Sequence, residues 1–284
     1  MSFTAVKGAM VPRVADTAGG TLSLRVLSAL VLTPPVLAAI YIGWPFFELL
    51  MVLMAALLAR EWDRLGGGAF GAGGIGLAAV CVGALALAAA GWYPWSAVIL
   101  VAGVPAVYGI ARLAGMGHPV WVAGGVVYIG LPLLALVWLR SVPDSGAWIV
   151  LWLVAIVAAT DIGAYFAGRG LGGPKLAPVI SPNKTWAGLA GGMLAAALTG
   201  GGGAWLLGYP QPGQALAAGL GLAVIAQAGD LAESAAKRFF GVKDSGSLIP
   251  GHGGLMDRVD GLVAAAPVMA ALIWWSGGQV PEWR

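Results

Sequence analysis

One stretch of this sequence, residues 230–260, gathers side chains suited to binding a divalent metal together with polyphosphate. Only 10% of the chain is charged, yet this stretch holds nine charged residues: Asp230, Glu233, Lys237, Arg238, Lys243, Asp244, Asp257, Arg258 and Asp260. Hard cations take oxygen ligands and bridge phosphate oxygens. Glycines beside His252 would let backbone N–H groups approach phosphates. The alternative is a solvated loop between membrane helices, but such a loop has no need to combine both charges with histidine and glycine.

The spacing in the first part of this stretch predicts a helical stripe. Asp230, then Glu233 or Ser234, then Lys237 follow at intervals of three or four residues. Residues at these intervals lie on the same face of a helix. The stripe would therefore present a carboxylate, then a hydroxyl or second carboxylate, then a cation.

The last part of the stretch predicts a second acidic helix face. Asp257 and Asp260 share a face, whereas Arg258 is expected to point elsewhere. If the helices that carry Asp230 and Asp257 pack side by side, these two carboxylates could meet across the interface and bind a metal.

Another polar group precedes this stretch, at the end of an apolar run. Asp161 and Tyr165 share a helix face, and Arg169 follows. An aspartate inside a hydrophobic span is costly, so it should face the bundle interior or a wet cavity. We keep two interpretations: a structural Asp161–Arg169 pair, or a polar wall of the site.

The segment Ser181-Pro182-Asn183-Lys184-Thr185 opens the next apolar run. Asn183 or Thr185 can cap the helix that follows. A helix N-terminus with Lys184 beside it forms an anion site. An ordinary capped helix start with a snorkelling lysine is the alternative.

These residues must be positioned by membrane helices. The chain has 284 residues, 60% of them hydrophobic, and a mean hydropathy of +0.89. Apolar runs of about 20 residues match the length that a helix needs to cross the bilayer core. Small residues allow close helix packing in lipid, and Gly188 and Gly192 are interpreted as such packing positions. We therefore expect an all-α polytopic integral membrane protein, in which Cys81 fills the core.

The apolar runs predict about nine transmembrane helices. Their expected bounds are 22–42, 45–59, 69–90, 92–111, 119–139, 147–168, 186–208, 214–236 and 259–276. Pro34 and Pro35 should kink or break the first helix, so the first two spans could instead form one re-entrant unit.

The distribution of Lys and Arg predicts the orientation. Nine spans with a cytoplasmic N-terminus place thirteen of the fifteen basic residues inside, and only Arg140 and Arg284 outside. Cytoplasmic ends carry such an excess. The charged stretch would then face the cytoplasm, where nucleotides are.

The chain changes character near residue 147. We expect about five spans in residues 1–146, where Arg60-Glu61-Trp62-Asp63-Arg64 is interpreted as an interfacial anchor. Residues 147–284 would form the catalytic region, with about four spans and two polar cytoplasmic loops at 169–185 and 237–258.

Several motifs resemble those of the phosphatidate cytidylyltransferases, also called CDP-diacylglycerol synthases. The similarity covers roughly residues 147–276. It rests on Ser234-x-x-Lys237-Arg238, Lys243-Asp244, Pro250-Gly251-His252-Gly253-Gly254, Asp257-Arg258-x-Asp260, Thr160-Asp161, Tyr165, Gly168-Arg169 and Ser181-Pro182-x-Lys184-Thr185. Two positions depart from the family pattern. Ala236 replaces a larger aliphatic residue, and Ala187 replaces a glutamate, which leaves the role of that acidic group open.

The resemblance implies transfer of CMP from CTP to phosphatidic acid, with Mg²⁺ and an optional second cation such as K⁺. It implies catalytic roles for Asp230, Lys237, Arg238, Asp257 and Arg258. It implies binding of CTP or lipid phosphates by Asp161, Arg169, Ser181, Lys184, Thr185, Ser234, Lys243, His252 and Gly253. It implies metal binding by Asp230 and Asp257, with Glu233 and Asp260 as second choices.

The expected partners are CTP, phosphatidic acid and membrane lipid, with no nucleic acid, and a homodimer is left open. The expected location is a bacterial inner membrane with the active site on the cytoplasmic side. A related enzyme for another lipid phosphate, such as an isoprenoid one, is the nearest alternative. A transporter would place its ionisable groups near the midplane and in repeats, whereas these lie at helix ends.

The orientation leads to a first testable prediction. On a Cys81→Ser background, a cysteine at Ser247 should react with a thiol reagent only after the membrane is permeabilised, and a cysteine at Glu282 should react from outside. Labelling of intact cells or spheroplasts measures this. External labelling at Ser247 together with protection at Glu282 would reverse the predicted topology.

Overall fold

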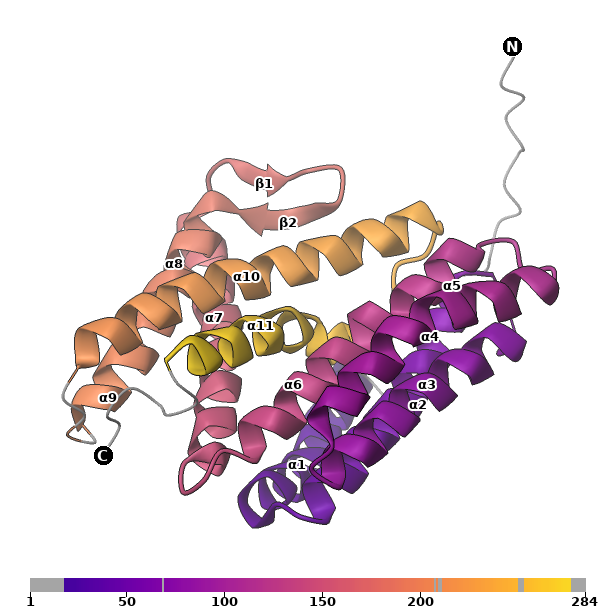
Figure 1. Cartoon of the computed structure of the whole chain (residues 1–284). Helices are drawn as coiled ribbons and strands as arrows, with labels where there is room; N and C mark the ends of the chain where they lie inside the picture. The colour runs from indigo at the N-terminus through magenta and orange to yellow at the C-terminus, as the bar shows by residue number, and fades with distance from the viewer. Residues whose placement is uncertain (1–17, 68, 207, 209–210, 250–252, 277–284) are drawn as a thin grey trace, which may run out of the picture.

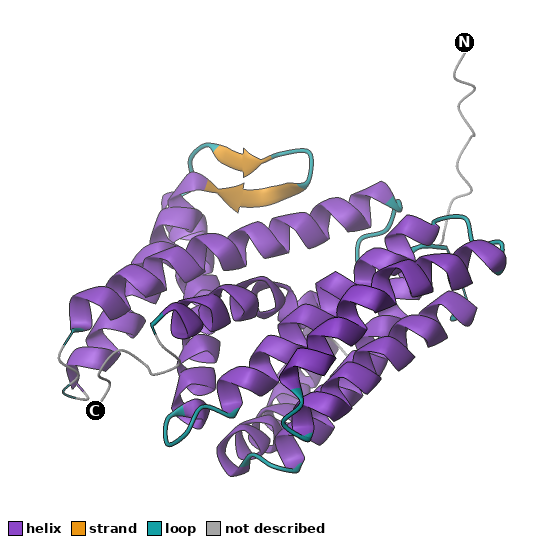
Figure 2. Ribbon diagram, viewed as in Figure 1, coloured by secondary structure: helices purple, strands orange, loops and turns teal. Residues whose placement is uncertain are grey.

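The computed structural model describes residues 18–67, 69–206, 208, 211–249 and 253–276, which fold into helices and one small hairpin (Figures 1 and 2). The first helices are α1 (Ala18–Ile42), α2 (Phe46–Leu65), α3 (Ala72–Ala89) and α4 (Tyr93–Leu113). A continuous segment follows, made of α5 (Pro119–Gly125), the π-helical η1 (Val126–Gly130) and α6 (Leu131–Arg140). The remaining elements are α7 (Gly146–Leu171), β1 (Lys175–Ala177), β2 (Ser181–Thr185), α8 (Trp186–Ala197), η2 (Leu198–Gly202), α9 (Gly203–Leu206), α10 (Pro212–Phe239) and α11 (Met256–Trp275).

Six helical segments are long and apolar enough to cross a membrane, judged by length and composition within the described residues. They are α3, α4, α5 with α6, α7, α8 with α9, and α10. An all-α polytopic membrane protein is therefore confirmed, apart from its small hairpin. Each of the nine predicted spans corresponds to a helical segment, but α1, α2 and α11 are not among these six, so nine membrane crossings stay a prediction.

The first helix differs from expectation at its proline pair. α1 continues through both Pro34 and Pro35, so of the two expected outcomes, a kink or a break, the break does not occur. Helices in lipid tolerate proline because neighbouring groups and local adjustments satisfy the freed carbonyl groups. The polar loop at 169–185 also differs, because its backbone pairs with itself as β1 and β2.

The helices fall into two groups that meet along α11. α7 packs closely on α8, and α10 packs on both α8 and α11. α11 also packs on α6 from the first part of the chain, so it lies between the two groups (Figure 1). The predicted boundary near residue 147 thus separates two parts that share a packed interface.

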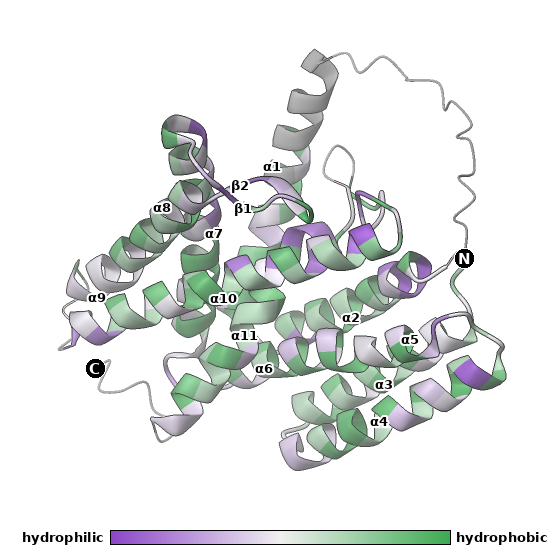
Figure 3. Ribbon diagram, turned by 90° about the horizontal axis from the view of Figure 1, so that it is seen from above, coloured by the Kyte–Doolittle hydropathy of each residue, from purple (hydrophilic) through white to green (hydrophobic). Residues whose placement is uncertain are grey.

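The polar ends of the helices gather at one end of the bundle. The end of α2 contacts the start of α11 through Glu61, and His118 before α5 contacts Phe240 after α10. Hydrophilic residues concentrate on the hairpin and one end of α10 (Figure 3). Arg140, predicted to lie on the other side of the membrane, caps the last turn of α1 by donating to the Ile40 and Tyr41 carbonyl oxygens at 2.6 and 2.9 Å. The end of α1 is predicted to lie on that same side, so this contact agrees with the predicted orientation.

Close packing of α7 on α8 depends on glycine, as the sequence predicted for Gly188 and Gly192. A Cβ atom at Gly192 would lie 2.8 Å from the Thr160 carbonyl oxygen. Nothing lies within 4 Å of a Cβ atom at Gly221, on α10.

These surroundings predict opposite effects of the same substitution. Gly192→Ala should destabilise the protein by about 1–3 kcal/mol, because the added methyl group overlaps a neighbouring backbone. Gly221→Ala should be neutral or stabilising, since alanine favours helix. Melting temperatures in detergent measure this, and equal effects of the two substitutions would contradict the packing described here.

Candidate active site

A cavity of about 730 Å³ opens between the hairpin and the polar ends of α7, α8, α10 and α11. Its volume is within the usual range for small-molecule sites. Four carboxylates and four cationic side chains line it: Asp161, Asp230, Asp257 and Asp260, and Arg169, Lys175, Lys184 and Arg258. Eight of the predicted site residues, including Thr185, thus share one cavity although more than 90 positions of sequence separate the first from the last.

α7 forms one wall of this cavity. Asp161 lies two turns before Arg169, and both side chains are exposed in the isolated chain and line the cavity. Arg169 donates a hydrogen bond to the Tyr165 hydroxyl at 3.0 Å. Among the described residues, no ion pair joins Asp161 to Arg169. The geometry therefore favours the polar-wall interpretation of Asp161.

The hairpin that follows α7 carries the predicted anion loop. Gly172 and Gly173 have φ angles of +64° and +92°, and their left-handed conformations turn the chain out of the helix. β1 and β2 then pair antiparallel, with Lys175 opposite Thr185. The Thr185 hydroxyl accepts a hydrogen bond from the Gly188 N–H at 3.0 Å and caps α8. Thr185, rather than Asn183, is therefore the cap.

The hairpin and α10 are joined by an ion pair across the cavity. Lys184 Nζ lies 2.7 Å from Asp230 Oδ2, and both side chains are partly exposed. Lys184 also donates to the Gln227 carbonyl oxygen at 3.4 Å. Ser234 donates to Asp230 Oδ1 at 3.3 Å, as expected from their shared helix face. Lys184 is thus held at the cavity wall before any anion arrives.

Asp257, at the start of α11, is the most extensively bonded carboxylate of the site. Its Oδ1 accepts a hydrogen bond from Lys237 Nζ at 2.6 Å. Its Oδ2 accepts from the Gly254 N–H at 2.9 Å, and from the Ser245 hydroxyl and N–H at 3.0 and 3.1 Å. The side chain is only 9% exposed. These charge-assisted bonds tie α10, α11 and the loop between them to one point.

Lys237 connects this point to a second buried carboxylate. Its Nζ lies 3.2 Å from Glu233 Oε1 and 2.6 Å from Asp257 Oδ1. The Glu233 side chain is 1% exposed. Neither Lys237 nor Glu233 lines the cavity, so in this structure the lysine pairs with Glu233 and with the cavity-lining Asp257 from behind the cavity wall.

The sequence suggested that Asp230 and Asp257 could meet across a helix interface, and the structure brings them together as lining of one cavity. Both line the same cavity, but each has its own lysine partner. Asp230 instead repels Asp161 and Asp260 electrostatically. Among the described residues, no three His, Cys, Asp or Glu side chains form a ready-made metal cage.

The other predicted site residues lie around the cavity rather than on it. Arg258 was expected on another face from Asp257 and Asp260, yet its long side chain also lines the cavity. Lys243 and Asp244 are exposed. The described residues that do not line the cavity are Ser181, Glu233, Ser234, Lys237, Arg238, Lys243 and Gly253. His252 lies outside the described residues.

Sequence reasoning missed some of the residues around the cavity. Gln227 lines it and lies one turn before Asp230, so its helix spacing was an available signal. Glu61, Trp62 and Asp63 were interpreted as interfacial anchors, but they are only 6%, 6% and 2% exposed. They are buried because α2 packs against the rest of the bundle, a long-range contact that local sequence does not show.

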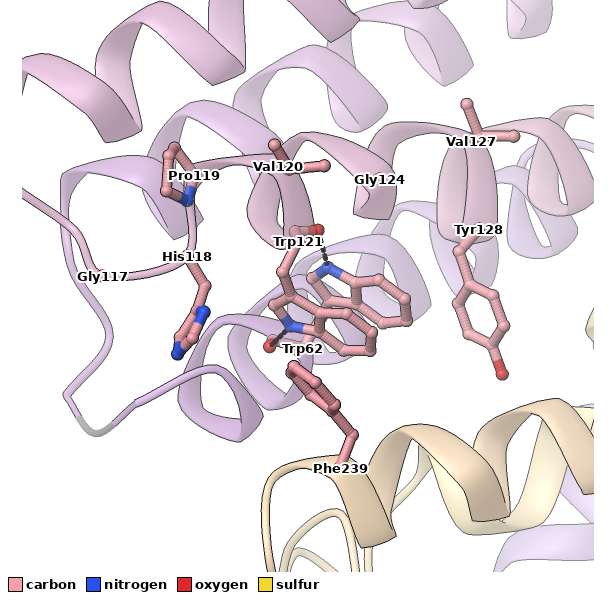
Figure 4. Close-up of a pocket in the computed structure, with 10 residues that line it drawn as sticks. All are labelled: Trp62, Gly117, His118, Pro119, Val120, Trp121, Gly124, Val127, Tyr128 and Phe239. Carbon is pink, nitrogen blue, oxygen red and sulfur yellow. Dashed lines mark hydrogen bonds between the residues drawn. The ribbon is translucent and has the colours of Figure 1, made fainter. Parts of the chain in front are cut away.

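A second, apolar cavity of about 670 Å³ lies between the start of α5 and the end of α10. Its wall contains Trp62 and Trp121, stacked 3.8 Å apart (Figure 4). Each indole N–H donates to the other residue's carbonyl oxygen, at 2.8 and 2.9 Å. This reciprocal pair fixes the end of α2, which carries Glu61 toward α11.

Residues 23–276 match the model of the Cytidylyltransferase family. The chain belongs to this family. A phosphatidate cytidylyltransferase of Pseudomonas aeruginosa is 37% identical over 281 residues, which cover 92% of this chain and 100% of that protein. One from Rickettsia bellii is 31% identical over 265 residues, covering 89% and 91%.

A phosphatidate cytidylyltransferase of Brucella suis has higher identity over a shorter part. It is 50% identical over 157 residues, which cover 52% of this chain and 55% of that protein. In this comparison the matched part spans about half the length of the relative. The motifs at 160–185 and 230–260 contain all the residues of the ion pairs described above, so these motifs hold the site together in this member of the Cytidylyltransferase family.

The bonding of Asp257 predicts the effect of removing its charge. Asp257→Asn should lower turnover per folded molecule about 100-fold, the cost of losing one preorganised electrostatic group, or ~3 kcal/mol. Asp244→Asn is the matched control and should be mild, because Asp244 is exposed. Activity and melting temperature, measured on the same preparations, separate a loss of turnover from a loss of stability. Near-normal turnover in Asp257→Asn, with only a lower melting temperature, would mean that Asp257 is purely structural.

Proposed function

We propose that this protein is a phosphatidate cytidylyltransferase that transfers CMP from CTP to phosphatidic acid, giving CDP-diacylglycerol and pyrophosphate. The observation that carries this proposal is the cavity of four carboxylates and four cations at the end of a membrane helix bundle. Membership of the Cytidylyltransferase family and the names of the full-length relatives support it.

The proposed reaction exchanges one phosphate bond for another. A phosphate oxygen of phosphatidic acid attacks the α-phosphorus of CTP, and the bond from that phosphorus to the pyrophosphate oxygen breaks. A phosphate monoester has a second pKa of about 6, so the nucleophile is already largely ionised at neutral pH. It needs no strong general base, which fits a cavity whose described lining has no histidine or cysteine.

The main difficulty of this reaction is to bring two polyanions together. The cavity is lined by cationic side chains from three parts of the fold. Lys175 and Lys184 come from the hairpin, Arg169 from α7 and Arg258 from α11. Catalysis would rest on positioning and on neutralising the charge of the phosphates. We assign these four cationic side chains to the phosphates of CTP and of the lipid.

The four carboxylates suit a divalent cation that is shared with the substrate. Alone they would repel polyphosphate, and a cation between carboxylate and phosphate removes that repulsion. Mg²⁺ is usually held by one or two carboxylates together with substrate phosphates rather than by a protein cage. This fits the lack of a three-carboxylate cage among the described residues.

The carboxylates differ in how well they could hold the cation. Asp257 is bonded on both oxygens, to Lys237, Ser245 and Gly254, and its side chain is only 9% exposed. Asp230 is also bonded on both oxygens, to Lys184 and Ser234, but its side chain is 32% exposed, so a cation can displace these partners more easily. We therefore propose Asp230 and Asp260 as the carboxylates that would hold Mg²⁺, with Asp257 orienting the loop beside them. When bound, Mg²⁺ would neutralise the phosphates of CTP.

The proposal includes nine membrane crossings, with this cavity on the cytoplasmic side of a bacterial inner membrane. α10 has 28 residues, or roughly 42 Å of helix, which exceeds the ~30 Å hydrocarbon core. Its charged end can therefore lie in the headgroup region, where water-soluble CTP and the phosphate of a membrane lipid can meet.

Purified protein in detergent should convert labelled CTP and phosphatidic acid to CDP-diacylglycerol, release pyrophosphate and require Mg²⁺ or Mn²⁺. Thin-layer chromatography measures the lipid product. Isoprenoid phosphate, tested in parallel, should be a poor acceptor. Efficient transfer to isoprenoid phosphate alone would assign another lipid substrate, and substrate accumulation in sealed vesicles without nucleotide consumption would favour a transporter.

A further inference from the structure

The start of α11 is held by a residue from the opposite end of the sequence. The first N–H groups of a helix lack partners within the helix, and no side chain at Leu255 caps α11. Instead, the N–H groups of Leu255 and Met256 donate to the two carboxylate oxygens of Glu61, each at 2.8 Å. Glu61 lies on α2, 194 and 195 residues earlier.

The charge of Glu61 is stabilised mainly by this helix start. Glu61 is buried, with only 6% of the residue exposed. Among the described residues, no lysine or arginine forms an ion pair with Glu61. A carboxylate is favoured at the positive end of a helix dipole, where N–H groups point at it. Glu61 thus depends on α11, and α11 on Glu61.

The same carboxylate reaches the loop before α11. The Ser245 hydroxyl lies 3.4 Å from Glu61 Oε2 and 3.0 Å from Asp257 Oδ2. Ser245 is 7% exposed. One buried hydroxyl therefore stands between Glu61 and the carboxylate on which the site depends.

Two glycines allow this close approach. A Cβ atom at Gly246 would lie 2.8 Å from Glu61 Oε1, and one at Gly254 would lie 3.0 Å from Glu61 Oε2. Any side chain at these two positions would push the loop away from α2. The loop is thus shaped to fit around the Glu61 carboxylate.

The end of α2 offers a rigid base for this contact. The next residue, Trp62, is locked to Trp121 by the reciprocal hydrogen bonds and stacking that Figure 4 shows. Phe240, just after α10, packs edge-on against Trp121 with ring centroids 4.8 Å apart. The same aromatic cluster therefore touches both α2 and the end of α10.

We propose that Glu61 is a positioning residue for the reaction, which sets the direction in which α11 presents Asp257 and Arg258 to the cavity. This inference rests on the proposed function. It gives the first part of the chain an influence on the site through α11, although none of the described residues before Asp161 lines the cavity. Glu61 does not line the cavity itself and acts through the backbone N–H groups of Leu255 and Met256.

Glu61→Gln tests the proposal. The amide has one oxygen and one NH₂ group, so it can accept from one N–H but faces the other with a donor. We expect kcat per folded molecule to fall at least about tenfold, because small misplacements of reacting groups have effects of this size or larger. The KM for CTP should change less than kcat, since Lys184 and the hairpin, which are also assigned to the phosphates, remain in place.

Asp63→Asn is the matched control. Asp63 is also buried at the end of α2 and also accepts a backbone N–H, from Gly71 at 2.8 Å, but it holds the loop before α3 instead. Both substitutions should lower the melting temperature, and only Glu61→Gln should lower kcat. Equal kcat values per folded molecule for Glu61→Gln and Asp63→Asn would overturn the proposal.

A second readout does not depend on activity or on the proposed function. Hydrogen–deuterium exchange at the Leu255 and Met256 amides should speed up in Glu61→Gln and stay slow in Asp63→Asn. If Glu61→Gln does not fold, Glu61→Asp provides the same comparison with a shorter carboxylate. Unchanged exchange at both amides would contradict the contact itself. A wild-type protein that transfers no CMP, but shows the exchange difference, would refute the proposed function and leave the contact standing.

Discussion

The structure of the site depends on how one buried carboxylate, Asp257, is kept charged. Removing a carboxylate from water costs several kcal/mol unless a cation and hydrogen-bond donors replace the water. Here Lys237, Ser245 and Gly254 supply those donors from α10 and from the loop before α11. Because these donors come from α10 and from two points of the loop before α11, satisfying this carboxylate also fixes the relative placement of α10, α11 and the loop.

Around this point, the protein separates charges that hold the fold from charges that face the cavity. Lys237 lies behind the cavity wall between the carboxylates of Glu233 and Asp257, and its positive charge is shared between them. Lys184 and Asp230 form a partly exposed pair on the wall itself, where a phosphate or a cation can compete for either partner. A buried pair is costly to break, whereas a partly solvated pair exchanges partners easily. The two lysines, which belong to two different motifs of the family, therefore suit different tasks.

Much of this arrangement follows from local sequence. Apolar runs of membrane length predicted the helices, because in lipid each backbone group must be bonded within its own segment. Helix spacing predicted that Asp230 and Ser234 lie on one helix face, and that Asp161 and Tyr165 do, as the structure shows. The position before an apolar run predicted a cap by Asn183 or Thr185, and the structure selects Thr185.

The rest depends on contacts between distant segments. The pairing of Lys184 with Asp230 requires α8 and α10 to be neighbours, which the spacing of either motif does not determine. The role of Glu61 at the start of α11 was hidden for the same reason, since a charged pentapeptide at the end of a helix also suits an interfacial anchor. The hairpin escaped prediction because its strands are only three and five residues long, and the second contains Pro182 and is otherwise polar.

The central claim is that Lys237 serves the site by neutralising Asp257. A double-mutant cycle on kcat/KM, with Lys237→Gln, Asp257→Asn and the combined variant, tests this most directly, with the folded fraction measured for each protein. Residues that act as one unit show strong non-additivity. We expect the combined variant to be about as active as the weaker single variant, with a coupling of at least about tenfold. Losses that simply multiply would show that the two residues act independently, and would contradict it.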